Sequence, residues 1–506
     1  MNVLRINHFV LAALGGIFAV AGFAPWNLFP LPALSLALLF WLWGRADSPR
    51  VSAWLGFYFG LGVFGAGIGW IYVALHDYGN MPMLLALLAT FLFVAFYALF
   101  PALAGYLQAK IGLPGWMRQA LLLPALWVAA ELLRGYLFTG FPWLAMGYAQ
   151  VPGSPLAGYA PLLGVYGVSL AAAISAGLLV LLVQQRWSAQ GKMAATMLLV
   201  LWLGGAALRM IEWTVPEGVP VKVSLLQGNI AQDEKFEEGR LVGTLETYRR
   251  LALGSDARLI VFPETAVPLL RGEMPENYAD ILREHARRNG SDILIGAFEQ
   301  EQGLYYNSMF SLGVSPAQAY RKNHMVPFGE FIPLRPLFGW LINEVLNIPM
   351  GDLASGGAQQ PLLRLAGQRI AMNICYEDVF GEEIIRALPQ ATLLLNVSND
   401  AWYGDSSAAM QHNQIAQMRA LETGRMMLRA TNTGVTSVIG SDGRVLKMLP
   451  QHAEGVLSAQ VQGYAGTTPY VRWGNAAVMG LLLAMLALAW SGRKSAIRPE
   501  EGVSGE

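Results

Sequence analysis

Long apolar runs fill the N-terminal part of the chain and return once near its C-terminus. A transmembrane helix needs about 20 mostly apolar residues, because the hydrocarbon core of a bilayer is about 30 Å thick. Eight segments approach or reach this length, seven of them before residue 212. We therefore predict transmembrane helices at Phe9–Phe23, Leu31–Trp43, Ser52–Leu75, Met83–Gln108, Gln119–Leu133, Leu162–Gln184, Met193–Met210 and Asn475–Trp490.

The first two segments are shorter than most of the others and lie close together in the chain. A cleaved signal peptide is therefore an alternative interpretation of Phe9–Phe23. Pro25 and Trp26 follow this segment, and the small residues of a cleavage site are missing. These features favour a transmembrane helix.

Between Glu212 and about Thr468 the pattern changes to short apolar runs separated by turns. Fully apolar strands are typical of a sheet that is covered on both faces, so strands mixed with helices predict an α/β domain. Gly440–Gly443 contains an Asp-Gly pair and predicts a hairpin turn. The predicted strands are Val221–Gln227, Arg258–Phe262, Asp292–Glu299, Tyr305–Leu312, Ala319–Lys322, Ile370–Ile374, Thr392–Val397, Val435–Ile439 and Val445–Met448, and the predicted helices are Glu276–Arg288 and Gln411–Leu428.

Composition agrees with this division of the chain. Hydrophobic residues make up 54% of the sequence and charged residues 13%, whereas an ordinary soluble domain carries about 25% charged residues. The formal net charge is zero, so no bulk electrostatic attraction to nucleic acid is expected. We predict a membrane domain with seven helices over residues 1–212, an α/β domain over 213–468, and a last transmembrane helix with a tail over 469–506.

Positively charged residues predict the orientation in the membrane, because Lys and Arg accumulate in cytoplasmic loops. The loops at 24–30 and 76–82 contain neither residue. Both termini are therefore predicted to be cytoplasmic, with the α/β domain on the opposite face, which is the periplasmic face of a bacterial inner membrane. The charges on the cytoplasmic side are Arg5, Arg45, Arg50, Lys110, Arg118, Arg186, Lys192, Arg493, Lys494 and Arg498.

Two features of the membrane part are candidates for a function. Glu131 and Arg134 lie three residues apart near one end of a predicted span, where charges are costly. They are either a functional pair or an interfacial pair whose side chains extend outward. The aromatic loop Thr139–Tyr148 is either an interfacial anchor or the wall of a lipid access path, and we favour an anchor role for Trp143.

Candidate chemistry lies at three strand ends of the α/β domain. Cys375, the only cysteine in the chain, follows the predicted strand ending at Ile374. Glu264 follows the strand ending at Phe262, and Lys322 ends the strand that begins at Ala319. Functional sites of α/β sheets collect at the carboxyl ends of strands, so the three residues form a candidate catalytic set. The alternatives are a buried structural cysteine and solvated loop charges.

Several motifs resemble the nitrilase superfamily and its Glu–Lys–Cys triad. With the predicted spans on both sides of this domain, the resemblance narrows to the apolipoprotein N-acyltransferases, the membrane-embedded branch of that superfamily, and covers essentially the whole chain. The motifs are Pro263–Glu264, Tyr320–Lys322 with Val326–Glu330, Ile374–Glu377, Tyr306–Ser308 and Ser398–Gly404.

This resemblance implies an αββα sandwich and the transfer of a fatty acyl group from a phospholipid to the α-amino group of a diacylglyceryl-cysteine apolipoprotein. A ping-pong reaction through a thioester on Cys375 is expected. The family often carries a tryptophan where this chain has Phe236, so the indole N–H is lost while an aromatic surface is retained.

The chemistry of the residues is consistent with this expectation. A thiolate is a strong nucleophile, but free cysteine has a pKa of about 8.5 and needs activation. Glu264 is the predicted base, which takes the thiol proton and returns it to the leaving alcohol. Lys322 is the predicted oxyanion stabiliser, together with a backbone N–H that follows Cys375.

Further residues are assigned supporting roles. The resemblance places Glu330 beside the triad, where it orients Lys322 or the acyl acceptor; the alternative is a charge on an exposed turn. Tyr376 and Glu377 either shape the pocket or pack the loop. Asn307 and Asn399 are expected to be structural. The segment Phe331–Met350 is either a buried helix or a lid resting on the membrane.

Other functions are open on sequence alone. A membrane-tethered nitrilase-type amidase is the first alternative, although a tether needs only one span. A transporter with an outer binding domain is the second, although few charges lie in the spans. We expect no metal or cofactor, because the six histidines are scattered and no HExxH, CxxC, phosphate-loop or dinucleotide motif occurs. We also expect a monomer.

Overall fold

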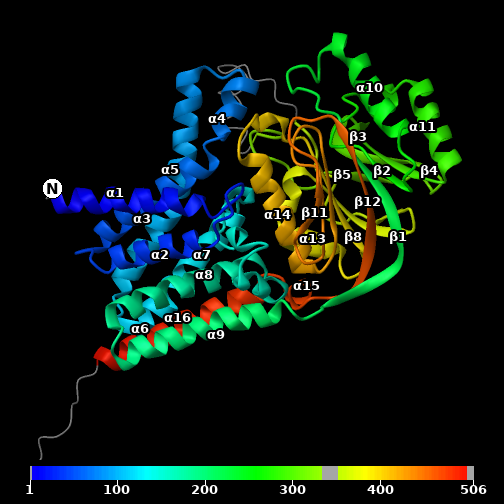
Figure 1. Ribbon diagram of the computed structural model, residues 1–506. Coiled ribbons are helices and arrows are strands. Elements are labelled where there is room, and N and C mark those ends of the chain that lie inside the picture. Colours follow the sequence, from blue (N-terminus) through cyan, green and yellow to red (C-terminus); the bar gives the residue numbers. More distant parts are fainter. Residues whose placement is uncertain (1–2, 333–351, 498–506) are drawn as a thin grey trace, which may run out of the picture. The chain divides into compact units, whose positions relative to one another are not determined.

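The computed structural model describes residues 3–332 and 352–497 and forms two compact units (Figure 1). The membrane unit comprises residues 1–69, 88–211 and 473–506, and the second unit comprises residues 70–87 and 212–472. Most of the predicted lid, Phe331–Met350, lies outside the described residues. The second unit thus includes residues 70–87, a segment that lies inside the predicted membrane domain in sequence.

Apolar helices form the membrane unit. Within the described residues, five helices are long and apolar enough to cross a membrane, and three further apolar helices are shorter. Each matches one predicted segment, so the chain is a membrane protein, while the number of eight crossings stays a prediction. The main helices are α1 (Val3–Val20), α2 (Pro30–Trp43), α3 (Pro49–Ile68), α5 (Met83–Ile111), α7 (Leu123–Tyr136), α8 (Ala160–Gln185), α9 (Ala189–Leu208) and α16 (Ala476–Ile497).

The third predicted span ends earlier than expected. Helix α3 stops at Ile68 instead of Leu75. Trp70 already belongs to the second unit, where its indole N–H donates to Gln411 Oε1 at 3.2 Å. The short helices α4 (Ile71–Val73) and η1 (Ala74–Tyr78) follow it. Hydropathy alone could not find this boundary, because residues 71–75 are apolar.

Glu131 and Arg134 are both buried, at 5% and 2% exposure, so an outward-reaching interfacial pair is wrong. Arg134 Nη1 donates to the carbonyls of Phe141 and Trp143, and Glu131 Oε1 accepts from the backbone N–H of Met146 at 3.0 Å. An irregular loop inside an apolar unit has no water for its backbone groups. The two charged side chains supply these partners.

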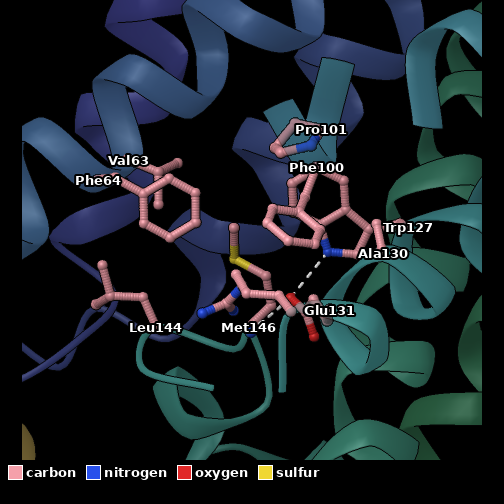
Figure 2. A pocket seen from close by; sticks show the side chains of 10 residues that line it. Val63, Phe64, Phe100, Pro101, Trp127, Ala130, Glu131, Leu144 and Met146 are labelled. Carbon is pink, nitrogen blue, oxygen red and sulfur yellow. Dashed lines mark hydrogen bonds between the residues drawn. The ribbon is translucent and has the colours of Figure 1, made fainter. Parts of the chain in front are cut away.

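A small cavity of about 20 Å³ lies beside Glu131. Figure 2 shows Glu131 with other side chains that line this cavity, including Met146 and aromatic residues. Trp127 Nε1 donates to Glu131 Oε1 at 3.0 Å. Trp143 lies in the same loop and stacks on Phe141 with 6.2 Å between ring centroids. Its exposure is only 3%, so the expected surface anchor is wrong: the loop folds inward and buries the ring.

The second unit contains two six-stranded sheets (Figure 1). The predicted α/β class and the implied αββα sandwich are confirmed. The first sheet has the order β12 (Gly455–Gly466), β1 (Thr214–Gln227), β2 (Leu259–Val261), β3 (Asp292–Glu301), β4 (Leu304–Gly313) and β5 (Ala319–Arg321). The second has the order β11 (Val445–Met448), β10 (Ser437–Ile439), β9 (Met427–Thr431), β8 (Leu393–Ser398), β7 (Gln368–Ile374) and β6 (Leu363–Leu365).

Three apolar layers hold this sandwich together. One lies between the sheets and includes Val223, Leu225, Leu395 and Val397, all fully buried. A second packs the first sheet against α10 (Glu238–Leu253) and α11 (Glu276–Asn289), and a third packs the other sheet against α13 (Gly381–Ile384) and α14 (Ala408–Thr423). Strands β1–β3 and β7–β9 run parallel within their sheets, so their carboxyl ends gather at one edge of each.

One predicted helix ran too far. Gln411–Leu428 was predicted to be helical throughout, but α14 ends at Thr423 and β9 begins at Met427. Gly424 caps the helix with φ +63°, a left-handed conformation that glycine adopts without strain. The apolar residues beyond Gly424 therefore form a central strand. Strands β6 and β12 and helix α10 were not predicted.

Asp292 joins the two sheets at the start of β3. Its Oδ1 accepts from Ser315 N at 2.8 Å, and its Oδ2 accepts from Ser315 Oγ at 2.7 Å and from Ala366 N at 2.7 Å. Ala366 lies in the turn between β6 and β7 of the other sheet. Asp292 is 1% exposed, and its carboxylate accepts from two backbone N–H groups.

We predict that Asp292→Ala destabilises the protein by about 1–3 kcal/mol, because it leaves these N–H groups without their acceptor. Thermal unfolding of the detergent-solubilised protein should show a lower Tm, by about 2–4 °C per kcal/mol for a domain of this size. Asp256→Ala is the control, since Asp256 pairs with Lys222 on the surface, and its Tm should stay at the wild-type value. Equal Tm values for both variants would contradict the role of Asp292.

Candidate active site

Cys375 lies directly after β7, at the first residue of the 3₁₀ helix η8 (Cys375–Val379). Its φ of +54° is a left-handed conformation that non-glycine residues rarely adopt. Its carbonyl oxygen accepts a hydrogen bond from Asn396 Nδ2 at 3.0 Å. Such a conformation persists only where surrounding contacts hold it, and it is common at functional sites.

The thiol of Cys375 is poorly disposed to ionise by itself. Burial raises its pKa, and the negative charges of Glu264 and Asp400 raise it further, while Lys322 and the Ser398 hydroxyl act in the opposite direction. A group that accepts the proton is therefore needed for reaction near neutral pH.

Glu264 follows β2 and is 6% exposed. Its Oε1 accepts from Asn307 Nδ2 at 2.7 Å, and its Oε2 accepts from the backbone N–H of Asn399 at 2.8 Å. Lys322 Nζ lies 3.5 Å from Oε1. Asn307 and Asn399, which sequence analysis placed in structural roles, thus fix the orientation of the carboxylate.

Lys322 follows β5 and is 1% exposed. Its Nζ lies 2.7 Å from Glu330 Oε1 in addition to its contact with Glu264. Burial acts to lower the pKa of Lys322, but Glu330, Glu264 and Cys375 outweigh it and hold the pKa well above its ordinary value. The ammonium group remains charged at any physiological pH and can stabilise a developing oxyanion.

Glu330 contacts Lys322 of the predicted triad. The alternative interpretation, a charge on an exposed turn, is therefore wrong. Glu330 Oε1 pairs with Lys322, and its Oε2 accepts from the backbone N–H of Val326 at 2.8 Å. One carboxylate oxygen of Glu330 therefore stabilises the Val326–Glu330 turn, and the other contacts Lys322.

Glu377 holds the loops around the site. It is 2% exposed and accepts from the backbone N–H groups of Ile374, Asn323 and His324 at 2.5, 2.6 and 3.1 Å. Burial raises the pKa of Glu377 to about 7, although these donors favour the carboxylate. Tyr376 is buried, with its ring edge-on to Phe380 at 5.2 Å. Both residues pack and fasten the loop.

Phe236 is 55% exposed and lines an open groove of about 620 Å³ together with Leu269, Leu270, Phe298 and Leu353. Its ring lies 6.5 Å from that of Phe298. Trp143, the remaining predicted supporting residue, belongs to the membrane unit.

Sequence reasoning missed Lys235, which is 2% exposed and donates to Thr265 Oγ1 at 2.5 Å and to the Glu264 carbonyl at 3.3 Å. Burial lowers its pKa to about 8, although Glu264 and Cys375 act to raise it. Lys235 thus contacts Glu264, the predicted base, and the next residue, Thr265. Its place beside Phe236 was the only signal, since nothing in the spacing distinguishes it from a surface lysine.

The segment Trp70–Tyr78 was also missed as a part of the catalytic unit. Trp70 packs edge-on against Tyr403 at 4.6 Å between ring centroids, and Tyr78 packs against Trp402 at 6.4 Å. Burial raises the pKa of Tyr403, and negative charge on Cys375 and Asp400 raises it further. The segment therefore supports one wall of the site.

Glu264, Lys322 and Cys375 lie at strand ends of an αββα sandwich, an arrangement typical of the nitrilase class of carbon–nitrogen hydrolase domains. Comparison supports this: residues 222–470 match the carbon-nitrogen hydrolase family, and residues 15–178 match the apolipoprotein N-acyltransferase N-terminal domain. The chain belongs to the apolipoprotein N-acyltransferase family, and the resemblance read from its motifs is confirmed.

Relatives in this family align with almost the whole chain. An apolipoprotein N-acyltransferase of Nitrosomonas europaea is 52% identical over 499 residues, which cover 95% of this chain and 97% of the relative. Proteins of the same name from Methylococcus capsulatus and Ralstonia nicotianae are 42% and 46% identical and cover 98% and 96% of this chain, and 98% and 94% of the relatives.

The single thiol makes its ionisation measurable by alkylation with iodoacetamide. Only the thiolate reacts, and the pKa of Cys375 is raised, so alkylation should be slow at pH 7 and should still be rising at pH values where free cysteine has levelled off. Lys322→Met removes a cation that favours the thiolate. We predict that it moves the midpoint upward by about one pH unit, equivalent to about 1.4 kcal/mol.

Lys447→Met is the matched control, because Lys447 is exposed and donates to the Ser458 carbonyl. Its alkylation profile should overlay that of the wild type. If Lys322→Met overlays it as well, Lys322 does not stabilise negative charge at Cys375.

Proposed function

We propose that this protein transfers a fatty acyl group from a membrane phospholipid to the α-amino group of diacylglyceryl-cysteine apolipoproteins. The observation that carries the proposal is the meeting of the only thiol of the chain with a buried carboxylate and a buried ammonium group, in a chain that also has a membrane unit. The names of the relatives agree with it.

In the first half-reaction, Glu264 takes the thiol proton and Cys375 Sγ attacks the carbonyl carbon of the phospholipid ester. The negative charge that develops on the carbonyl oxygen is stabilised by Lys322 and a backbone N–H following Cys375. The C–O bond then breaks. Glu264 returns its proton to the departing alkoxide, which leaves as a lysophospholipid, and a thioester remains on Cys375.

In the second half-reaction, the α-amino group of the apolipoprotein attacks the thioester carbonyl. Glu264 takes a proton from the attacking amine, and the same cation stabilises the oxyanion. The C–S bond breaks, an amide is formed, and the sulfur recovers its proton. Because Asn307 and Asn399 hold both oxygens of Glu264, one carboxylate is oriented to act in both halves.

Supporting roles follow from the contacts. Glu330 orients Lys322, Tyr376 and Glu377 hold the loop that carries the nucleophile, and Asn307 orients the base. Phe236 offers an exposed aromatic surface to an acyl chain or to the acceptor.

The arrangement in the cell follows from the distribution of Lys and Arg. The enzyme resides in the bacterial inner membrane as a multi-pass protein, with both termini cytoplasmic and the catalytic domain periplasmic. The proposed parts are residues 1–212, 213–468 and 469–506, with the segment around Trp70–Tyr78 packed in the catalytic unit.

Incubation with a phospholipid that carries a labelled acyl chain tests the proposal. We predict that intact-mass analysis finds one acyl group on the wild type, bound as a thioester that hydroxylamine releases. Cys375→Ala should carry none. Glu264→Gln should form the thioester about 10²–10⁴-fold more slowly, because the general base is lost.

Asp256→Asn, a change at an exposed ion pair, is the control and should acylate like the wild type. Addition of a diacylglyceryl lipopeptide should then move the label to the peptide amine. Label that passes only to water would favour a membrane-tethered amidase, and acyl transfer that persists in Cys375→Ala would sink the thioester mechanism.

A further inference from the structure

Four charged side chains form a buried cluster behind Cys375. They are Asp378 in η8, Asp400 in η10 (Asp400–Tyr403), His412 in α14 and Arg429 in β9, and none exceeds 2% exposure. Four separate elements thus contribute one charge each. The mechanism proposed above uses none of them, and a buried charge is costly unless it is paired.

The geometry determines the protonation state of His412. Its Nε2 lies 2.8 Å from Asp378 Oδ1, and its Nδ1 lies 3.0 Å from Asp400 Oδ1. Ionised carboxylates only accept hydrogen bonds, so both ring nitrogens must carry a proton. Burial and Arg429 act to lower the pKa of His412, but the two aspartates outweigh them and raise it above its ordinary value.

Arg429 completes the charge balance. Its guanidinium donates to Asp378 Oδ2 at 3.2 Å and to Asp400 Oδ2 at 2.8 Å. Burial acts to raise the pKa of Asp400, but Arg429 and His412 hold it below its ordinary value. Two anions and two cations therefore cancel. Without the positive charge on His412, the cluster would carry a net negative charge.

The cluster is connected directly to the nucleophile. His412 Nε2 also lies 3.3 Å from the Cys375 carbonyl, which accepts from Asn396 Nδ2. Arg429 Nη1 in turn donates to Asn396 Oδ1 at 2.6 Å. The carbonyl of the left-handed residue is thus held from two sides, by side chains that the cluster itself orients.

We infer that His412 is a permanently protonated positioning residue, which holds the strained backbone of Cys375 and cancels the negative charge of Asp378 and Asp400 behind the thiol. This inference rests on the proposed role of Cys375 as the nucleophile. Asp400 disfavours the thiolate, so the cation beside it removes an electrostatic obstacle to its formation. The other groups that interact electrostatically with the thiol are Glu264, Lys322, Lys235, Tyr403 and the Ser398 hydroxyl.

The first measurement needs no variant. Among the six histidines, one imidazole should keep the ¹⁵N chemical shifts of an imidazolium up to pH 9 in the detergent-solubilised wild type. If all six titrate to the neutral form below pH 8, the inference fails.

The second measurement is iodoacetamide alkylation of Cys375 across pH in His412→Gln. Glutamine can place an N–H near the position of Nε2 but carries no charge. We predict a tenfold lower alkylation rate at pH 8, a midpoint about one pH unit higher, and a lower kcat for acyl transfer.

Glu422→Gln is the matched control. Glu422 lies on the same helix, is as buried as His412, and pairs with Arg419 at 3.1 Å. It should lower Tm while leaving the alkylation midpoint in place. An unchanged midpoint in His412→Gln, with a fall in Tm like that of the control, would show a purely structural role. Alkylation uses no lipid, so it can be measured independently of acyl transfer. If His412→Gln shifts the alkylation midpoint of Cys375 while the wild type transfers no acyl group, this inference stands and the proposed function is overturned.

Discussion

The face-to-face packing of the two sheets is the constraint on which the catalytic unit depends. Glu264 and Lys322 follow strands of one sheet, and Cys375 follows a strand of the other, so neither sheet contains the full set. The apolar layer between the sheets carries no chemistry, yet it sets the separation of the reacting groups. Any change in that packing would move the nucleophile relative to its base.

The burial of charged side chains is the second constraint on the structure. Little water reaches Glu264 or Lys322, so each needs protein partners, and Asn307, Asn399 and Glu330 supply them. The same requirement explains the paired charges behind Cys375. In the membrane unit, Arg134 and Glu131 meet the equivalent demand of an irregular backbone. The positions of the reacting residues are thus fixed by the polar partners that surround them.

Much of the fold was predictable, because apolar periodicity is a local property. Strands such as β3 and β8 and the hairpin of β10 and β11 appeared within a residue or two of their observed bounds. The helix α14 was predicted too long because Met427 and Leu428 are apolar in either structure, and only the left-handed Gly424 separates them. The buried aromatic Trp143 was misplaced for a related reason: hydropathy does not distinguish a ring at the membrane surface from one inside.

Local patterns along the chain were enough to predict the membrane helices, the α/β class and the three residues at strand ends, since each depends on neighbouring residues. Which charged side chains meet depends on the folded chain. Lys235, His412 and Trp70 gained their places from partners up to 341 residues away, and no local pattern marks such pairings. The physical reason is that a buried polar group is defined by the opposite surface that covers it, and that surface exists only after the chain has folded.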